Sequence, residues 1–440
     1  RFYFTNLQKY MISYTIKANG KTVKGGKMSV NVEPQGSKEI TIATSGLKSK
    51  PGTEYFIYFN VTTTEPEPLI PVGHEIAYEQ FRLPIEPGER TFATGGPALK
   101  VSAEGNELTA SSSKVNFVFD KKTGLVSSYK VGGTEYFKDG LGLQPNFWRA
   151  PNDNDYGNGN PKRLQVWKQS SKNFNVVDAN IVMDGKDAVL TANYLLAAGN
   201  LYIVTYRISP SGVVKADFTF TSTDMEAAKT EASEATLMAT FTPGSDAARK
   251  AASKLEVPRI GVRFRLPAEM NQVEYFGRGP EENYIDRNAG TLIDLYKTTA
   301  DQMYFPYVRP QENGHHTDTR WLTLNKKGGK GLTIYADKTI GFNALRNSVE
   351  DFDGEETVSR PYQWLNRDAG ELVHDESKAK DQLPRKTHIN DITPRNFVEV
   401  CVDMKQQGVA GYNSWGARPE PGYNIPANQK YKWGFTIVPR

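Results

Sequence analysis

The chain has 440 residues, more than a single hydrophobic core usually serves, so we expect two or three domains. Its 54 basic and 50 acidic residues give a net charge of +4 without a long block of either sign, and it has no membrane-length apolar run, which argues against nucleic acid and membrane as partners. Frequent glycine (38) and proline (25), with 11% aromatic residues, are typical of a turn-rich all-β protein.

The first 85 residues alternate apolar and polar side chains with period two, for example over residues 10–16 and 54–61. Turn dipeptides such as Asn19-Gly20 separate these runs. We predict an immunoglobulin-like β-sandwich over residues 1–85, followed by a Pro/Gly/Glu-rich linker over 86–97. The sequence begins in a strand-like run without Met or signal peptide, so we expect a piece of a longer protein, and bacterial cytoplasm and periplasm both stay open.

Strand-like runs recur through the rest of the chain without a clear amphipathic helix. They predict one large antiparallel β-supersandwich over residues 98–440. Residues 225–237, rich in Ala and Glu, are compatible with either a short helix or a surface insertion. The clearest runs are at 115–119, 202–208, 214–220 and 262–266.

Several kinds of reactive site are absent from the sequence. There is no Gly-x-Ser-x-Gly nucleophile motif, and the five histidines and one cysteine show no metal-ligand spacing, so we expect no metal site in this chain. Cys401 lies in a strand-like run and is predicted to be an inert buried thiol. His315 and His316 lie in a predicted loop; because adjacent residues of an extended chain point to opposite sides, we expect a solvated or hydrogen-bonding role.

Three segments are unusually dense in polar and aromatic residues: 146–160, 274–287 and 411–416. One interpretation is structural, with Asn, Asp and Gly forming turns and the aromatic rings filling gaps. The other is a carbohydrate site, in which amides and carboxylates bind sugar hydroxyls and a flat ring stacks on the C–H face of the sugar. Composition alone leaves both interpretations open.

In this order, and together with residues 303–314, these segments resemble the C-terminal domains of family 2 β-galactosidases. The resemblance covers about residues 140–440, and its most specific motifs are Gly-Pro-Glu-Glu-Asn-Tyr-Ile-Asp-Arg at 279–287 and Tyr-Val-Arg-Pro-Gln-Glu-Asn-Gly at 307–314. The first 85 residues look like the immunoglobulin-like domain that precedes this region. The resemblance implies a galactose mutarotase-like supersandwich for residues 98–440.

The resemblance also implies an activity, the retaining hydrolysis of terminal β-D-galactose by two glutamates. In the family these lie in a (β/α)8 barrel N-terminal to the region seen here, so no catalytic residue is assigned to this chain, which we expect to be inactive alone. The implied partners are a β-galactoside, the barrel of the same polypeptide and further copies in a homo-oligomer. Any divalent cation or sodium would belong to the barrel, so we expect no cofactor in this chain.

Six residues are candidate substrate contacts by this resemblance. Trp415, beside Asn413 and Ser414, matches the tryptophan that the family places next to the active site, where its ring stacks on the sugar. Residues 155–160 match a glycine-bearing loop at the mouth of the active site, which makes Asp155, Gly157 and Asn158 candidates.

Acidic residues of the same segments are expected to brace loops rather than to serve as the catalytic carboxylates. We predict that Asp153, Asp155 and the pair Glu281-Glu282 accept backbone N–H groups or pair with arginine. The arginines available for this pairing are Arg149, Arg278 and Arg287.

Two other functions fit the same residues. The chain could be a stand-alone carbohydrate-binding module in which Trp415 and the two loops form a complete groove. It could also be a purely structural module that covers the flank of a barrel or mediates oligomerisation. The sequence does not specify which galactoside would be cleaved.

Overall fold

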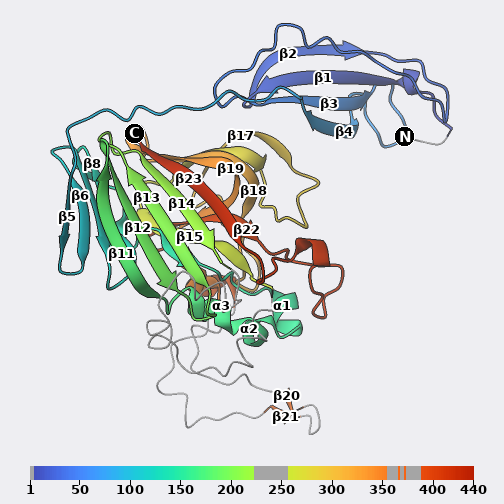
Figure 1. Ribbon diagram of the computed structural model, residues 1–440. Coiled ribbons are helices and arrows are strands. Elements are labelled where there is room, and N and C mark those ends of the chain that lie inside the picture. Colours follow the sequence, from blue (N-terminus) through green and yellow to red (C-terminus); the bar gives the residue numbers. More distant parts are fainter. Residues whose placement is uncertain (1–3, 222–255, 354–364, 367–370, 373–387) are drawn as a thin grey trace. The chain divides into compact units, whose positions relative to one another are not determined.

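The computed structural model describes residues 4–221, 256–353, 365–366, 371–372 and 388–440 (Figure 1). The chain forms two compact units. The first comprises Arg1–Phe92 with Leu292–Leu295, and the second comprises Ala93–Thr291 with Tyr296–Arg440. The predicted helix or insertion at 225–237 lies outside the described residues.

The first unit contains a four-stranded antiparallel sheet in the order β2-β1-β3-β4. Ile16, Tyr55 and Ile57 form its buried core, and irregular backbone contributes Ile42 and Leu47 as the opposing layer. The strands predicted at 10–16 and 54–61 are confirmed. The elements of this unit are the 3-10 turn η1 (Leu7–Lys9) and the strands β1 (Tyr10–Ala18), β2 (Lys21–Met28), β3 (Tyr55–Thr63) and β4 (Glu75–Arg82).

The second unit is built from two large antiparallel sheets, which confirms the predicted all-β class. The smaller sheet has the order β5-β6-β7-β8-β9, with β5 (Lys100–Glu104), β6 (Glu107–Ser111), β7 (Val115–Asp120), β8 (Leu125–Val131) and β9 (Thr134–Glu135). The larger sheet has twelve strands in the order β10-β15-β22-β19-β23-β14-β13-β12-β11, and β18 extends it from β19 to β16 and β17.

The strands of the larger sheet include the segments predicted at 202–208, 214–220 and 262–266. Their bounds are β10 (Gln144–Asn146), β11 (Asn175–Asp184), β12 (Asp187–Leu195), β13 (Leu201–Ile208), β14 (Val214–Phe220), β15 (Arg259–Pro267), β16 (Gln272–Gly279), β17 (Leu292–Thr299), β18 (His316–Asn325), β19 (Gly331–Leu345), β22 (Phe397–Gln406) and β23 (Tyr431–Pro439). A separate two-residue pair joins β20 (Leu365–Asn366) and β21 (Glu371–Leu372).

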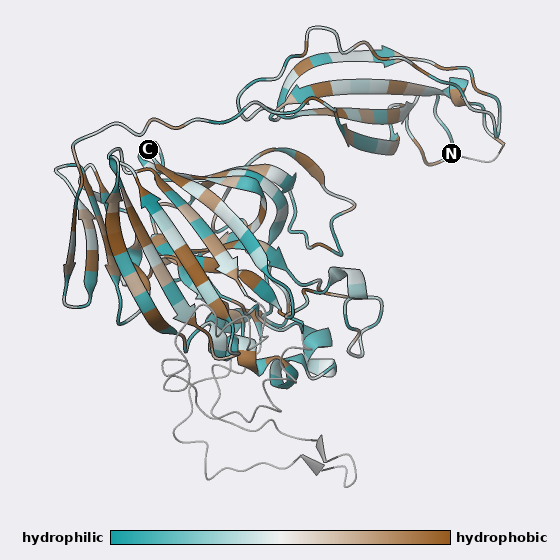
Figure 2. Cartoon of the chain, viewed as in Figure 1, coloured by the Kyte–Doolittle hydropathy of each residue, from teal (hydrophilic) through white to brown (hydrophobic). Residues whose placement is uncertain are grey.

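Aromatic side chains hold the two sheets of the second unit together. The ring of Phe117 on β7 lies 5.6 Å from that of Tyr206 on β13, and Phe119 meets Tyr194 on β12 at 6.4 Å. Buried and partly exposed residues alternate along β12 and β14, and Figure 2 shows this as bands of hydropathy. Such alternation places one face of each strand in a shared core, as a sandwich requires.

Short helices interrupt the strand pattern and correct the expectation of a glycine-bearing loop at 155–160. Asn152 caps the first helix: its side chain accepts from Asp155 N at 2.9 Å, while the Asp155 carboxylate accepts from Asn152 N at 3.0 Å. Pro161 lies in the first turn of the second helix. In the described ranges, no helix is long and apolar enough to cross a membrane. The helices are α1 (Asp153–Gly157), α2 (Asn160–Arg163), α3 (Gln165–Ser170) and α7 (Val349–Phe352), with 3-10 turns η2 (Lys138–Gly140), η4 (Ile389–Asp391) and η5 (Pro421–Tyr423).

Candidate functional site

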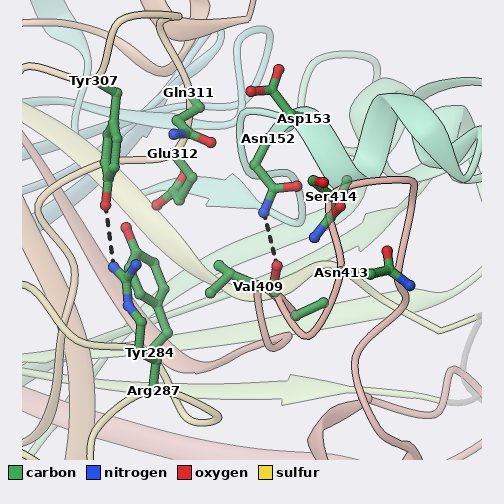
Figure 3. A pocket seen from close by; sticks show the side chains of 13 residues that line it. Asn152, Asp153, Tyr284, Arg287, Tyr307, Gln311, Glu312, Val409, Asn413 and Ser414 are labelled. Atoms are coloured by element: carbon green, nitrogen blue, oxygen red, sulfur yellow. Dashed lines mark hydrogen bonds between the residues drawn. The ribbon is translucent and has the colours of Figure 1, made fainter.

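The three polar-aromatic segments of the sequence meet around one pocket of the second unit (Figure 3). The pocket has a volume of about 290 Å³. It is lined by residues 152–154 at the start of α1, by Tyr284 and Arg287 after β16, by residues drawn from 307–312 before β18, and by residues drawn from 409–414 after β22. The motifs that carry the family resemblance therefore form a single site.

A carboxylate holds the beginning of the loop that carries Trp415. The two oxygens of Asp286 accept from the backbone N–H groups of Val409 (3.0 Å) and Ala410 (2.7 Å). Ala410 has φ of 60°, in the left-handed region that costs a residue with a Cβ about 1–2 kcal/mol. Gly408 is packed so closely that a Cβ there would lie 2.4 Å from Asp286 Oδ2. The clamp thus fixes a strained turn at the pocket wall.

Helix α1 holds the end of the same loop. Asn154 Oδ1 accepts from Gly416 N at 3.2 Å, and Asn158 Nδ2 donates to Ala417 O at 3.4 Å. At the beginning of the loop, Asn152 Nδ2 donates to Val409 O at 3.0 Å (Figure 3). The loop is therefore anchored on both sides of Trp415.

Trp415 is held out toward solvent by this anchored loop. Its side chain is 84% exposed, which is unusual for a residue of this size. Asn413 Oδ1 accepts from the backbone N–H groups of Trp415 (3.0 Å) and Ala417 (3.1 Å), so the Asn413 side chain shapes the turn. Asn413 and Ser414 line the pocket, while Trp415 follows them directly in the chain. An exposed indole on a fixed turn is available for stacking on a ligand.

The candidate Asp155 braces the site from inside and does not line the pocket. It is 2% exposed and forms a double ion pair with Arg149, with N–O distances of 2.5 and 3.1 Å. Asn160 Nδ2 also donates to Asp155 Oδ1 at 2.9 Å. The predicted pairing of Asp155 with Arg149 is confirmed. Gly157 lies against the backbone of Trp415 and Gly416 and likewise does not line the pocket.

Glu282 organises the pocket wall opposite α1. Its carboxylate accepts from Arg287 Nη2 (2.6 Å), Tyr284 Oη (3.2 Å), Gly314 N (2.7 Å) and the Tyr307 hydroxyl. Burial raises the pKa of both tyrosines, and the neighbouring Glu282 carboxylate adds to that shift. Both hydroxyls therefore stay protonated and donate to Glu282.

The predicted pairing of arginines with the Glu281-Glu282 pair is confirmed for Arg287 and wrong for Arg278. Arg278 Nε lies 2.6 Å from Asp318 Oδ2 and its Nη1 donates to the carbonyl groups of Asn288 and Thr291. The physical reason is proximity: Arg278 lies near the end of β16 and Asp318 near the start of its partner strand β18, so Asp318 is the carboxylate that Arg278 reaches.

Glu312 supplies a buried carboxylate to the pocket lining. Its Oε1 lies 2.5 Å from Arg259 Nη2, and its Oε2 accepts from Ala150 N at 3.2 Å. Arg259 is fully buried and also donates to Gln406 Oε1 at 2.5 Å. The positive charge of the buried Arg259 therefore compensates the negative charge of Glu312.

A second buried pair lies behind Glu312. His315 Nδ1 lies 3.7 Å from Asp403 Oδ2, and in the sheet register Asp403 stands opposite Gly261 on one side and Gly341 on the other. A Cβ at Gly261 would lie 2.1 Å from Asp403 Oδ1, and one at Gly341 would lie 2.5 Å from the His315 ring. The two glycines make room for the pair. Burial raises the pKa of Asp403 to about 7 and lowers that of His315 well below its ordinary value.

Both histidines of the predicted loop are buried, so neither is solvated. The ring nitrogens of His316 lie within hydrogen-bond distance of Gly314 O (3.0 Å) and Pro280 O (3.2 Å). The ring of His315 stacks on Tyr284 with 5.6 Å between centroids. Among the described residues, no three His, Cys, Asp or Glu side chains are arranged to hold a metal ion.

The sequence analysis named only Asn413 and Ser414 of the thirteen pocket residues as candidates. Five of the other eleven lie in the two most specific motifs: Tyr284, Arg287, Tyr307, Gln311 and Glu312. These motifs, at 279–287 and 307–314, served in the sequence analysis only as marks of resemblance. The available signal was that both motifs combine aromatic and amide residues with glycine, as residues 411–416 do, and add charged residues to them.

Comparison with known families and proteins gives two matches that together cover most of the chain. The "Beta galactosidase small chain" family matches residues 111–437, and "Beta-galactosidase, domain 4" matches residues 1–84. The chain is 29% identical over 439 residues to a β-galactosidase of Priestia megaterium and 24% identical over 440 residues to one of Halalkalibacterium halodurans. These alignments cover 99% of this chain but only 36% and 37% of those proteins, so the chain spans little more than a third of their length.

Similar solved structures include a galactose 1-epimerase and a galactose mutarotase related enzyme, both from Lactobacillus acidophilus. The first has 6% identity and a TM-score of 0.35 over 78% of this chain and 98% of that one. The second has 9% identity and a TM-score of 0.34 over 76% of this chain and 97% of that one. By its match over residues 111–437, the chain belongs to the β-galactosidase small chain family.

Proposed function

We propose that this chain is the C-terminal part of a retaining β-galactosidase that hydrolyses terminal non-reducing β-D-galactose residues. In this proposal the chain contributes the Trp415 indole as an aromatic wall of the active site, and a (β/α)8 barrel elsewhere in the polypeptide carries the catalytic glutamates. The observation that carries the proposal is the exposed indole, 84% accessible, on a loop anchored at both ends beside a polar pocket. The alignment to about a third of each relative supports a partner region in the same polypeptide.

The state of the pocket carboxylates supports a catalytic pair outside this chain. A retaining glycosidase needs one carboxylate free to attack the anomeric carbon and a second carboxyl about 5 Å away. The pocket carboxylates are Asp153, which pairs with Arg309 at 3.2 Å, and Glu312, which pairs with Arg259 at 2.5 Å. Both pocket carboxylates are engaged by arginine, and no further Asp or Glu among the described residues lines this pocket, so bond cleavage is better assigned to another region.

The chemistry around Trp415 suits a sugar. A pyranose ring presents a face of C–H groups that stacks on an indole, and its hydroxyl groups then point to the sides, where amide and hydroxyl side chains bind them. Asn413 and Ser414 offer such groups next to the indole. Of the six substrate contacts expected from the sequence, we therefore keep Trp415, Asn413 and Ser414 as contacts. We assign the other three, Asp155, Gly157 and Asn158, to the support of the loop.

The proposal is tested with the 440-residue chain and with a longer polypeptide that also contains the upstream region. We expect the chain alone to leave nitrophenyl-β-galactoside unhydrolysed and the longer polypeptide to hydrolyse it. In the longer polypeptide, Trp415→Ala should raise KM and lower kcat/KM by about 10- to 100-fold, equivalent to about 1–3 kcal/mol of lost stacking. Trp415→Phe should retain part of the activity.

Met183→Ala is the matched control, since Met183 is also an exposed large apolar residue (40%) but lies on β11. It should leave both kinetic constants unchanged. Turnover by the chain alone would show that the catalytic carboxylates lie here after all. Unchanged kinetics of Trp415→Ala would remove the indole from the active site.

A further inference from the structure

We propose that the pocket beside Trp415 is a carbohydrate subsite in its own right, which binds one neutral pyranose unit within this chain. The pocket is distinct from the stacking surface, because the indole is not part of its lining. The inference rests on the proposed function for the identity of the ligand as a sugar of the galactoside substrate. The binding itself requires only residues of this chain.

The charges of the lining argue for a neutral ligand. Each of the lining charges already has an opposite partner: Arg287 with Glu282 at 2.6 Å, Glu312 with Arg259 at 2.5 Å, and Asp153 with Arg309 at 3.2 Å. The Glu312–Arg259 pair is buried, so a charged ligand would have to break it or enter beside it without a counter-charge, and both are costly. A neutral molecule with hydroxyl groups neither breaks an ion pair nor buries an uncompensated charge.

Neutral hydrogen-bonding groups face the pocket without partners in the described part of the chain. The Gln311 amide and the Ser414 hydroxyl make no hydrogen bond to described residues, and the Asn413 Nδ2 group is likewise unused, because only its Oδ1 shapes the Trp415 turn. In the view of Figure 3, Gln311 and Glu312 lie between Tyr307 on one side and Ser414 on the other. These amide and hydroxyl groups match the alternating donors and acceptors of a sugar ring.

The size and stiffness of the pocket suit a single ring. Its volume of about 290 Å³ is at the small end of ligand pockets, which start near 300 Å³. The Asp286 clamp holds Val409 and Ala410 in place before any ligand arrives, so little ordering entropy is lost on binding. Val409 and Ala410 add an apolar patch to the lining, which the C–H groups of a pyranose can contact.

Calorimetric titration of the 440-residue chain tests the proposal, with D-galactose, D-glucose and D-galacturonate as probes. We expect the neutral sugars to bind in the millimolar range and the anionic D-galacturonate at least ~10-fold more weakly. The double variant Gln311→Ala/Ser414→Ala should weaken binding of the neutral sugars at least ~10-fold, since it removes two hydrogen-bonding groups. Ser102→Ala, at an exposed serine of β5, is the control and should bind like the parent chain.

Trp415→Ala separates this proposal from the proposed function. In the 440-residue chain it should retain binding of the neutral sugars, while in the longer polypeptide it should impair hydrolysis. Three results would overturn the subsite: no binding of any neutral sugar, unchanged binding by the double variant, or equal affinity for D-galacturonate. None of these results affects the kinetic test of Trp415, so each proposal can fail alone.

Discussion

Gly157, at the end of α1, and Gly416, directly after Trp415, lie backbone against backbone. A Cβ added to Gly157 would lie 2.7 Å from Trp415 O and 2.8 Å from Gly416 Cα, and one added to Gly416 would lie 2.6 Å from Gly157 C. These contacts are shorter than real side chains tolerate, and on both sides the obstacle is backbone. The position of the indole therefore depends on the absence of a side chain at residue 157.

Gly157→Ala should displace the Trp415 loop. The added methyl group meets backbone that cannot rotate away, so we expect a loss of about 1–3 kcal/mol in the free energy of unfolding, as for overpacked cores. In the longer polypeptide KM should rise several-fold. Urea unfolding and steady-state kinetics measure the two effects. Gly422→Ala is the control, because a Cβ at Gly422 meets nothing within 4 Å; equal behaviour of the two variants would contradict the close approach.

The parts of the fold that depend on local pattern could be predicted, and the parts that depend on contacts far apart in sequence could not. Period two over residues 202–208 and 214–220 is visible in the sequence and corresponds to β13 and β14. Helices α1 and α2 have five and four residues, too few for a 3.6-residue period to emerge. A capping box of Asn152 and Asp155 marks the start of α1, and Pro161 in the first turn marks the start of α2.

In the candidate site, too, local sequence patterns could be predicted and contacts between residues far apart in sequence could not. The exposed Trp415 was identified because its neighbours resemble a known loop. The Asp286 clamp joins residues separated by 123 and 124 positions, and no local pattern indicates that pairing. Asp403 likewise lies between Val402 and Met404 on β22, and only the register that places Gly261 and Gly341 on either side of it reveals room for a buried carboxyl group.

Asp286→Asn should loosen the beginning of the Trp415 loop. The amide keeps the size of the carboxylate but has only one oxygen, so one of the two N–H groups of Val409 and Ala410 loses its acceptor. We expect a loss of about 1–3 kcal/mol in the free energy of unfolding, measured by urea denaturation. Asp301→Asn is the control, because Asp301 is half exposed and its contacts are long: a 3.7 Å ion pair with Arg346 and a 3.4 Å hydrogen bond from Asn271 Nδ2.

Ala410→Gly tests the strain that the same clamp stabilises. Glycine adopts a φ of 60° without the Cβ penalty, so this variant should raise the free energy of unfolding by up to about 1 kcal/mol. A fall in the urea midpoint of Ala410→Gly would show that the methyl group contributes packing that outweighs the strain.

Arg149→Ala should be among the most destabilising changes at the site. It leaves the carboxylate of Asp155 buried without its counter-charge, which costs about 3–5 kcal/mol. Arg207→Ala, which breaks the exposed pair with Asp184, should cost less than about 1 kcal/mol. Thermal unfolding of the two variants gives the comparison, and similar melting temperatures would rule out a structural role for the buried pair.

Asp403 and His315 should influence stability with opposite dependence on pH. Burial raises the pKa of Asp403 from 3.8 to about 7, so between these values the folded chain keeps a proton that the unfolded chain releases. This makes the free energy of unfolding fall as pH rises through that range. Burial, with the positive charge of Arg259, lowers the pKa of His315 well below 6.5, so below pH 6.5 the unfolded chain takes up a proton that the folded chain does not. This makes the free energy of unfolding rise with pH up to about 6.5.

Below pH 6.5 the two effects oppose each other wherever the folded chain keeps His315 neutral and Asp403 protonated, because folding then moves one proton from histidine to aspartate without changing their total. Asp403→Asn removes the aspartate contribution, so relative to the parent chain its free energy of unfolding should rise by about 1.4 kcal/mol per pH unit between pH 4.5 and 6.5. The five tryptophans in the described part of the chain belong to the second unit, so their fluorescence during urea unfolding reports on the unit that contains the pair. Parallel pH profiles for the variant and the parent chain would mean that Asp403 is ionised throughout this range, with Arg259 outweighing its burial.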